Sequence, residues 1–386
     1  MLKKTLRITL IVLVVFFTAF FVFVPNLVDR YINRTIHASG PADKNGWYDS
    51  IPFIADLHCD ALLWNRNLLV RHSFGHVDVP RMQEANVALE VFTVVSKTPI
   101  GINYDKNSDK TDMNALLSFA QLRAPQDWFD MKARALHQCE QLHRFADESN
   151  GKFRVIANKH ELLNYMAERS HDRSLTAGLL GIEGAHCLEG NLNNLDDFYN
   201  AGVRYIGLTH FFDNEWGGSA HGEKKGGLTE KGKQLLHRMD SLHIIIDLAH
   251  ASPATISDIF KVTTGPLLVS HTGVKGTCDG VRNLSDAQIM EIGRRHGLIG
   301  IGLWETAVCG TDADATARSI KYVADKIGVD KVAMGSDFDG ATHSSYDITG
   351  FPVIVKALIK QGFTRPGIEQ IMGGNVRDFL LRNLPE

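Results

Sequence analysis

Short runs of branched apolar residues recur along most of the chain, separated by segments of helical length. The runs lack the alternation of a half-exposed strand, a pattern typical of parallel strands buried on both faces. Strands that alternate with helices predict a parallel sheet. Nine runs fit this pattern: 53–56, 88–95, 153–156, 179–182, 205–209, 244–248, 267–270, 298–303 and 332–335. Because an α/β barrel has eight strands, we place the weakest run, 153–156, outside the barrel.

The N-terminus follows a different pattern. Three basic residues precede an uncharged, mostly apolar run from Ile8 to Val24, which we expect Pro25 to end. The run is at the short limit for a membrane-spanning helix and slightly long for a signal-peptide core. No small-x-small cleavage pattern follows it closely, so residues 1–25 are predicted to form an uncleaved signal anchor; a cleaved signal peptide is the alternative. The basic residues favour a cytoplasmic N-terminus, with the rest of the chain on the extracytoplasmic (periplasmic) side.

Residues 26–47 are polar and contain Gly40-Pro41, which predicts a linker to a domain formed by residues 48–386. A single barrel with insertions accounts for the length of that domain. Two of its connections are long: residues 101–127 are predicted to form an irregular loop or lid, and residues 211–227 to hang over one rim. The net charge of −3 gives no electrostatic case for binding nucleic acid.

The five cysteines contain no C-x-x-C pair. An exported chain permits disulfides, and an odd count leaves at least one thiol free or paired with another chain. Cys278 and Cys309 follow neighbouring predicted strands, so a bond between them is one candidate.

Residue types that bind metals follow several predicted strands. The runs 244–248 and 267–270 are followed closely by His250 and His271. Consecutive parallel strands joined by a helix end side by side, so these two imidazoles are expected to be neighbours at the rim where α/β barrels carry their chemistry. Neutral imidazole is the commonest metal ligand, and the pair predicts half of a metal site.

Two further positions contribute carboxylates. His58 and Asp60 are two residues apart at the end of the first run, so they point the same way and can hold one ion, although a solvated loop has the same pattern. Glu183 ends a buried run, where an acid is unusual unless it is paired or metal-bound. Its two oxygens could bridge two ions. The nearby His186 is interpreted as an ordinary loop histidine.

The remaining candidates have several open roles. His210 could be a ligand, a hydrogen-bond donor to a developing oxyanion, or a loop residue. Of the two acids after the last run, Asp337 is closer to the strand than Asp339 and is the better candidate for a proton-handling base. Together the candidates follow six predicted strands: His58, Asp60, Glu183, His210, His250, His271 and Asp337. Four imidazoles with several acids suggest two divalent ions close together.

These segments, taken in order, resemble the membrane (renal) dipeptidases, a branch of the metal-dependent amidohydrolases. The resemblance runs from about Phe53 to the C-terminus and rests on D-L-H-C-D, L-L-G-I-E-G, G-L-T-H, I-D-L-A-H-A-S, V-S-H-T-G and G-S-D-F-D-G. It implies a (β/α)8 TIM barrel of the metal-dependent hydrolase type. We assign the chain to the bacterial-type members; the segment after His210 and the insertion 101–127 differ from mammalian members.

The resemblance also implies two Zn²⁺ ions per subunit. His58, Asp60 and Glu183 would hold the first ion. Glu183 would bridge to the second ion, which His250 and His271 would complete. The implied activity is hydrolysis of the peptide bond of dipeptides, with a metal-bridging hydroxide as the nucleophile.

Three more residues match substrate-binding positions of that family. His210 matches the histidine that steadies the oxyanion. Arg282 matches the arginine that binds the terminal carboxylate, a task that suits a guanidinium. Asp337 matches the acid that contacts the free amino group and takes a proton from the hydroxide. The expected partners are a small dipeptide, the membrane through the N-terminal helix, and a second subunit in a candidate homodimer.

Three alternatives remain at this point. The same metal site could act on a lactone or another small amide. A membrane-tethered binding protein that has lost catalysis would be expected to lack ligands, yet every expected ligand position is filled. A glycosidase that uses Glu183 and Asp337 alone would not need the histidines.

Overall fold

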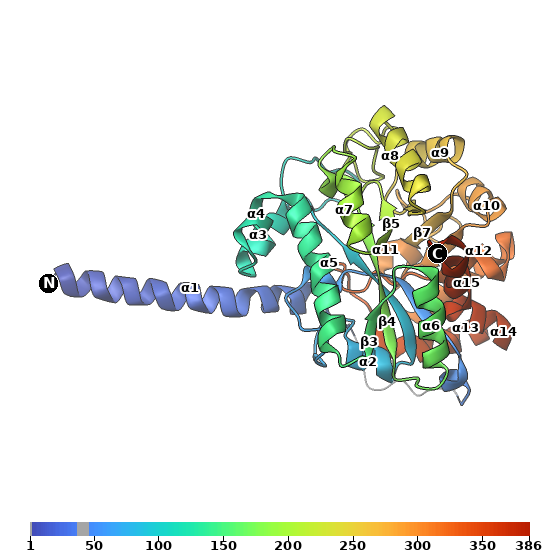
Figure 1. Ribbon diagram of the computed structural model, residues 1–386, viewed down its shortest axis with the longest axis horizontal. Helices are drawn as coiled ribbons and strands as arrows, with labels where there is room; N and C mark the ends of the chain where they lie inside the picture. Colours follow the sequence, from blue (N-terminus) through green and yellow to red (C-terminus); the bar gives the residue numbers. More distant parts are fainter. Residues whose placement is uncertain (1, 37–45) are drawn as a thin grey trace.

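The computed structural model describes residues 2–36 and 46–386, and within them one sheet of parallel strands closes into a barrel (Figure 1). The order around the sheet is β1-β2-β4-β5-β6-β7-β8-β9, and β3 pairs with β4 off this path. The two ends of the sheet meet where Cys59 forms a parallel bridge with Phe338. The strands are β1 (Ile54–Cys59), β2 (Val87–Val94), β3 (Phe153–Val155), β4 (Thr176–Glu183), β5 (Val203–Gly207), β6 (Ile245–Asp247), β7 (Leu267–Thr272), β8 (Leu298–Ile301) and β9 (Val332–Met334).

The strands confirm the prediction from the buried apolar runs. Each predicted run overlaps one strand, and the run 153–156 forms β3, which pairs only with β4 outside the barrel. An eight-stranded parallel barrel is therefore the observed fold. The strands are buried along their whole length except for part of β3, which explains why their sequences do not alternate.

Helices follow the strands and cover the barrel on the outside (Figure 1). Polar N-caps begin many of them; for example, the Thr229 side chain accepts a hydrogen bond from the Gly232 backbone at the start of α8. The helices are α1 (Leu2–Ile32), α2 (Val79–Glu84), α3 (Met113–Ala120), α4 (Pro125–Phe129), α5 (Met131–Glu148), α6 (Lys159–Arg169), α7 (Asn194–Asn200), α8 (Glu230–Ser241), α9 (Pro253–Val262), α10 (Asp286–Arg294), α11 (Glu305–Val308), α12 (Ala313–Ile327), α13 (Phe351–Lys360), α14 (Arg365–Glu369) and α15 (Asn375–Asn383).

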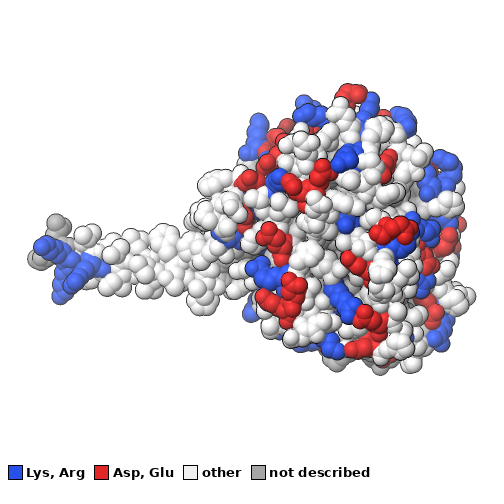
Figure 2. Space-filling view, in the orientation of Figure 1, with Lys and Arg blue, Asp and Glu red and all other residues white. Residues whose placement is uncertain are grey.

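The N-terminal helix is longer than predicted. Helix α1 passes through Pro25 and ends at Ile32, so the predicted end at Pro25 is wrong and residues 26–32 of the predicted linker are helical. The continuation is held by the barrel: Asp29 forms an ion pair with Arg66 at 2.9 Å. Residues 37–45 of the predicted linker lie outside the described residues. Figure 2 shows an uncharged surface along α1 between its basic tip and the domain.

The two long connections are more ordered than predicted. Residues 101–127 contain α3 and the start of α4, so the prediction of an irregular loop is wrong there. The Asp112 side chain caps α3 by accepting a hydrogen bond from the Ala115 backbone. The second connection, 211–227, lies against the first: the Asn107 backbone donates to the carbonyl of His221. The two segments together cover one side of the rim.

The barrel interior supports the rim from below. Gly181 leaves room for the ring of Tyr205, because a Cβ at position 181 would lie 2.3 Å from the Tyr205 Cζ atom. The buried Tyr205 hydroxyl donates to the Leu57 carbonyl at 3.1 Å and lies 3.3 Å from Nδ1 of His58. The packing of the interior thus fixes the position of a predicted rim residue.

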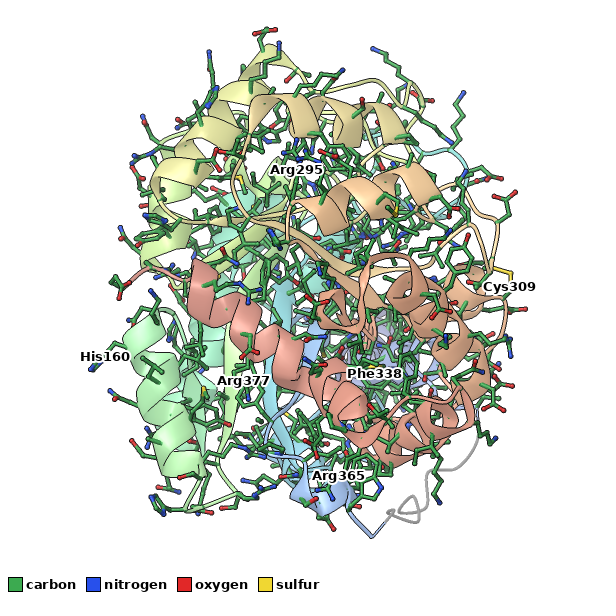
Figure 3. The ribbon with its side chains drawn as sticks, turned by 90° about the vertical axis from the view of Figure 1, so that its right-hand side faces the viewer. His160, Arg295, Cys309, Phe338, Arg365 and Arg377 are labelled. Carbon is green, nitrogen blue, oxygen red and sulfur yellow. A yellow bond between two sulfur atoms is a disulfide. The ribbon has the colours of Figure 1, made fainter. Side chains whose placement is uncertain are left out.

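A disulfide joins Cys278 and Cys309, as the sequence suggested. The bond connects the loop after β7 with the end of α11, and Figure 3 shows Cys309 at the edge of the molecule. The remaining cysteines, Cys59, Cys139 and Cys187, are free and buried. The crosslinked loop includes Arg282, so the bond restrains a predicted substrate-binding residue.

We predict that replacing both Cys278 and Cys309 by Ser lowers the free energy of unfolding by about 3–4 kcal/mol, because the bond closes a loop of some 30 residues in the unfolded chain. Denaturant unfolding of the oxidised protein measures the difference. The double variant with added reductant is the control, since reduction should not destabilise it further. Equal unfolding midpoints for wild type and variant would contradict the prediction.

Candidate metal centre

The predicted rim residues converge around the carboxylate of Glu183, the last residue of β4. One of its oxygens, Oε1, lies 2.8 Å from Nε2 of His250, 3.2 Å from Nε2 of His271 and 3.7 Å from Nε2 of His58. The other oxygen, Oε2, lies 3.2 Å from Nε2 of His210. Four imidazoles from four strands therefore face one buried carboxylate.

The acids on the β1 side complete the cluster. Nε2 of His58 is 3.5 Å from Oδ1 of Asp60 and 3.8 Å from Oδ1 of Asp337. Within the described residues, three groups of buried side chains have ligand atoms within 4.8 Å of one another, and two of these groups share Glu183. The groups are His58 with Glu183 and His271, Glu183 with His210 and His250, and His58 with Asp60 and Asp337.

Three of the imidazoles are held in the neutral form that binds metals. Burial lowers the pKa of His210, His250 and His271 well below the usual value, and the charge of Arg282 lowers it further. The Nε2 atoms of His250 and His271 are only 3.1 Å apart. Two neutral imidazole nitrogens that both face Glu183 at this separation are suited to share a cation with it.

The opposite side of the cluster carries excess negative charge. Burial lowers the pKa of His58, but Glu183 and Asp60 outweigh it and raise the value to about 10. Burial is also the main reason why the pKa of Glu183 is well above its usual range, with Asp60 adding to the shift. Several carboxyl groups in a water-poor site are stable as anions only near compensating positive charge. Divalent cations would supply that charge, so the donor set fits a binuclear metal site.

A buried serine orients two of the imidazoles. The hydroxyl of Ser270 donates its one hydrogen to Oδ2 of Asp247 at 2.6 Å, so its lone pairs face Nδ1 of His271 at 2.9 Å and Nδ1 of His58 at 3.2 Å. Both imidazoles then carry their hydrogen on Nδ1, which leaves Nε2 free to bind a cation. Ser270 and Asp247 were not among the residues predicted from the sequence. Asp247 could have been found, because it is an acid within the buried apolar run I-I-I-D. The same feature, an acid in a buried run, was the reason for selecting Glu183.

Three rim residues have an unusual backbone conformation. His250, Asp337 and Asp339 have φ values of 61°, 61° and 62°, a left-handed region that residues other than glycine rarely adopt. Such conformations concentrate at functional sites, where surrounding contacts hold them. Asp339 is fully buried and forms an ion pair with Arg66 at 2.8 Å. Of these two acids, Asp337, the predicted base, lines the pocket and Asp339 does not.

A pocket of about 590 Å³ opens above the cluster. Its floor is polar and includes Asp60, Glu183, His210, His250 and Asp337. One wall is apolar and includes residues of the insertion 101–127, the last residue of α1 and a residue shortly after it: Ile102, Met113, Leu117, Ile32 and Ile36. A mostly apolar wall with a few convergent polar groups is typical of a small-molecule site.

Arg282 lies at the side of this pocket. Its Nη2 donates to the carbonyl of His271 at 2.7 Å, and its guanidinium lies 5.0 Å from the ring centre of Trp304. Its Nε is buried with no hydrogen-bond partner among the described residues. His186, by contrast, is buried against Phe212 and does not line the pocket. The structure thus brings Arg282 to the metal cluster and leaves His186 out of it.

We predict that Ser270→Ala weakens metal binding about 10- to 100-fold, because His58 and His271 lose the partner that fixes their hydrogens. Competition with a fluorescent chelator measures the affinity. Ser319→Ala is the matched control, because Ser319 is also buried and hydrogen-bonded, to Thr277 at 2.7 Å, but lies in α12. Equal affinities of the two variants would count against the orienting role of Ser270.

Known proteins share this architecture. The sequence profile of the family described as "Membrane dipeptidase (Peptidase family M19)" matches residues 50–380. Among curated proteins, dipeptidase aclJ of Aspergillus oryzae is 27% identical over 344 residues, covering 84% of this chain and 76% of its own. Dipeptidase verJ of Clonostachys rogersoniana is 30% identical over 210 residues, covering 52% and 53%.

Solved structures of related proteins have a similar fold. The crystal structure of dipeptidase AC, a metallopeptidase of family M19, is 25% identical with a TM-score of 0.70, covering 86% of this chain and 99% of that one. A metallopeptidase of Rhodobacter sphaeroides, solved with a phosphinate mimic of the dipeptide L-Ala-D-Ala, has the same TM-score and coverage at 24% identity. These relatives are fungal and bacterial, so they do not single out the expected bacterial type. With a profile match over most of its length and a buried histidine–carboxylate cluster on a parallel barrel, the chain belongs to the membrane dipeptidase family of metallopeptidases, M19.

Proposed function

We propose that the protein is a membrane-anchored zinc dipeptidase with two cations bridged by Glu183. The observation that supports this most directly is the position of the Glu183 carboxylate, which has the Nε2 atoms of three imidazoles within 3.2 Å and a fourth at 3.7 Å. The three are His210, His250 and His271, and the fourth is His58. No other described carboxylate faces so many imidazoles. A mixture of imidazole and carboxylate ligands suits zinc.

The ligands divide into two sets. His58, Asp60 and Glu183 would hold one cation, and Glu183, His250 and His271 the other. When bound, such a pair supplies a water-derived hydroxide as nucleophile near neutral pH and polarises the scissile carbonyl. The protein fixes these ligands through Ser270, which lies within 3.2 Å of Nδ1 in both His58 and His271.

Three residues are proposed to bind and turn over the dipeptide. Arg282 receives the terminal carboxylate, since its buried Nε has no partner among the described residues. His210 donates a hydrogen bond to the developing oxyanion. Asp337 binds the free amino group and moves the proton to the leaving amine; burial and the nearby Asp60 raise its pKa to about 7, against the lowering effect of His58.

Anchors for both ends of the substrate explain a preference for dipeptides. A longer peptide would have to bury its continuing chain against a charged side chain at one end of the pocket. The relative from Rhodobacter sphaeroides was solved with a mimic of L-Ala-D-Ala, which supports a dipeptide as the substrate class. A second subunit in a homodimer remains a proposal that follows from the family resemblance.

Membrane attachment is proposed to occur through α1. Residues 3–32 form a helix that is long and apolar enough to span a bilayer, and its side chains are largely exposed. Its end is part of the pocket wall at Ile32 and of the buried ion pair between Asp29 and Arg66. These contacts favour an uncleaved anchor over a cleaved signal peptide. The basic N-terminus favours an extracytoplasmic, periplasmic catalytic domain.

Removal of the metal tests the proposal first. We predict that exhaustive chelation abolishes dipeptide hydrolysis and that two equivalents of Zn²⁺ restore it. Glu183→Gln should lose most of both ions, because the bridging carboxylate belongs to both sets of ligands, whereas Glu189→Gln, beyond the end of β4, should keep two. Elemental analysis with a dipeptide assay measures both effects. Full activity of the metal-free protein would refute the proposal.

Arg282→Met separates a dipeptidase from a hydrolase of lactones or other neutral small amides. We predict that kcat/KM for dipeptides falls by at least about 100-fold, because a buried charge-assisted pair with the substrate carboxylate contributes roughly 3 kcal/mol. Hydrolysis of a neutral ester or lactone should change little. If the variant keeps its dipeptide activity, the assignment of Arg282 to the carboxylate is wrong.

A further inference from the structure

A group of large apolar side chains lies exposed on the insertion between β2 and α5. Leu122 and Phe129 are 63% and 87% exposed, and four further members are also exposed: Ile100, Met113, Leu116 and Phe119. We call these six residues the insertion patch. Isolated exposed apolar residues are ordinary, but a group of this size on one short segment marks a surface that another molecule covers.

The insertion patch adjoins the N-terminal helix. The rings of Phe119 in α3 and Phe21 in α1 meet edge to face, with 5.4 Å between their centres. Figure 1 shows α3 beside the part of α1 that meets the domain. The apolar surface of α1 and that of the insertion are therefore continuous.

The position of Phe21 fixes the depth of the patch. Phe21 lies inside the apolar run Ile8–Val24, and the first acidic residue of α1 is Asp29, which is paired with Arg66 of the barrel. At 1.5 Å per residue, Phe21 lies along the helix axis about 5 Å from Val24, where the apolar run ends. It lies about 10 Å from Val28, the residue before Asp29. If α1 spans a bilayer, Phe119 must reach a similar depth. This depth is similar to the depth of about 5–10 Å to which the apolar faces of interfacial helices are buried in the boundary between lipid headgroups and acyl chains.

We propose that the insertion patch is a second membrane-contacting surface, which docks on the bilayer that α1 spans. The inference rests on the proposed membrane anchoring and specifies the orientation of the domain. The patch and the pocket share Met113, and Ile32 at the end of α1 also lines the pocket. The pocket therefore opens beside the lipid headgroups, so its substrates are dipeptides present at the membrane surface.

Depth measurements on the full-length protein in phosphatidylcholine–phosphatidylglycerol vesicles test the proposal. Nitroxide labels are placed at Leu116→Cys and Phe129→Cys in the patch and at Val15→Cys in α1. Leu163→Cys in α6 and Met290→Cys in α10 are matched controls, because their wild-type side chains are 49% and 52% exposed, close to the 55% of Leu116. The free native cysteines are buried, and dipeptidase activity of each labelled protein verifies its fold.

The expected result is that labels at 15, 116 and 129 collide several-fold more often with oxygen, relative to a water-soluble nickel chelate, than labels at 163 and 290. If 116 and 129 match the controls while 15 is in lipid, the docking surface is refuted and the anchor stands. If 116 and 129 are shielded from both reagents and show spin–spin broadening, a second copy covers the patch and the proposal falls. A label at 15 in water overturns both proposals.

Discussion

The centre of this protein is a carboxylate placed where an isolated anion is costly. Glu183 is almost completely buried, and burial together with Asp60 raises its pKa well above the usual range. Its neighbours on one side are neutral imidazoles, which offer lone pairs but no charge. Such a group is stable as an anion when cations lie between it and the imidazoles. The other rim residues supply the ligands that such cations need.

A closed parallel barrel meets the requirement with few local sequence features. Every strand ends at the same rim, so a single residue at the end of each strand is enough to bring side chains from distant parts of the chain within a few ångströms. Residues of the barrel interior support the rim histidines. Tyr205 and Ser270 point from the barrel interior to the Nδ1 atoms of His58 and His271, which turns their Nε2 atoms toward Glu183.

The strands and most of the rim residues could be predicted, because they depend on the local pattern of apolar and polar residues. Continuous apolar runs identified the strands, and polar residues directly or closely after the runs identified Glu183, His250 and His271. The supporting residues were harder to find, because the contacts of Ser270 with Asp247 and two histidines depend on strand register. The full length of α1 was also missed. Pro25 is a strong local signal for a helix end, but contacts with the barrel override it.

The N-terminal helix, which is long and apolar enough to span a membrane, also makes specific contacts with the barrel. Arg66 is paired with both Asp29 of α1 and Asp339, which is two residues from Asp337. The Asn33 side chain accepts a hydrogen bond from the backbone of Ala341 in the same loop. Removing residues before 34 would therefore break contacts with the loop that carries a proposed catalytic acid, and it would remove Ile32 from the pocket wall.

Glu183 is proposed to bridge two cations. Electron paramagnetic resonance of the metal-free protein loaded with two equivalents of Mn²⁺ tests it most directly, because ions about 3.5–4 Å apart on a shared carboxylate are exchange-coupled. We expect the wild type to give the multiline spectrum of a coupled pair. A spectrum of isolated ions at full loading, or saturation at one ion per chain, would contradict it.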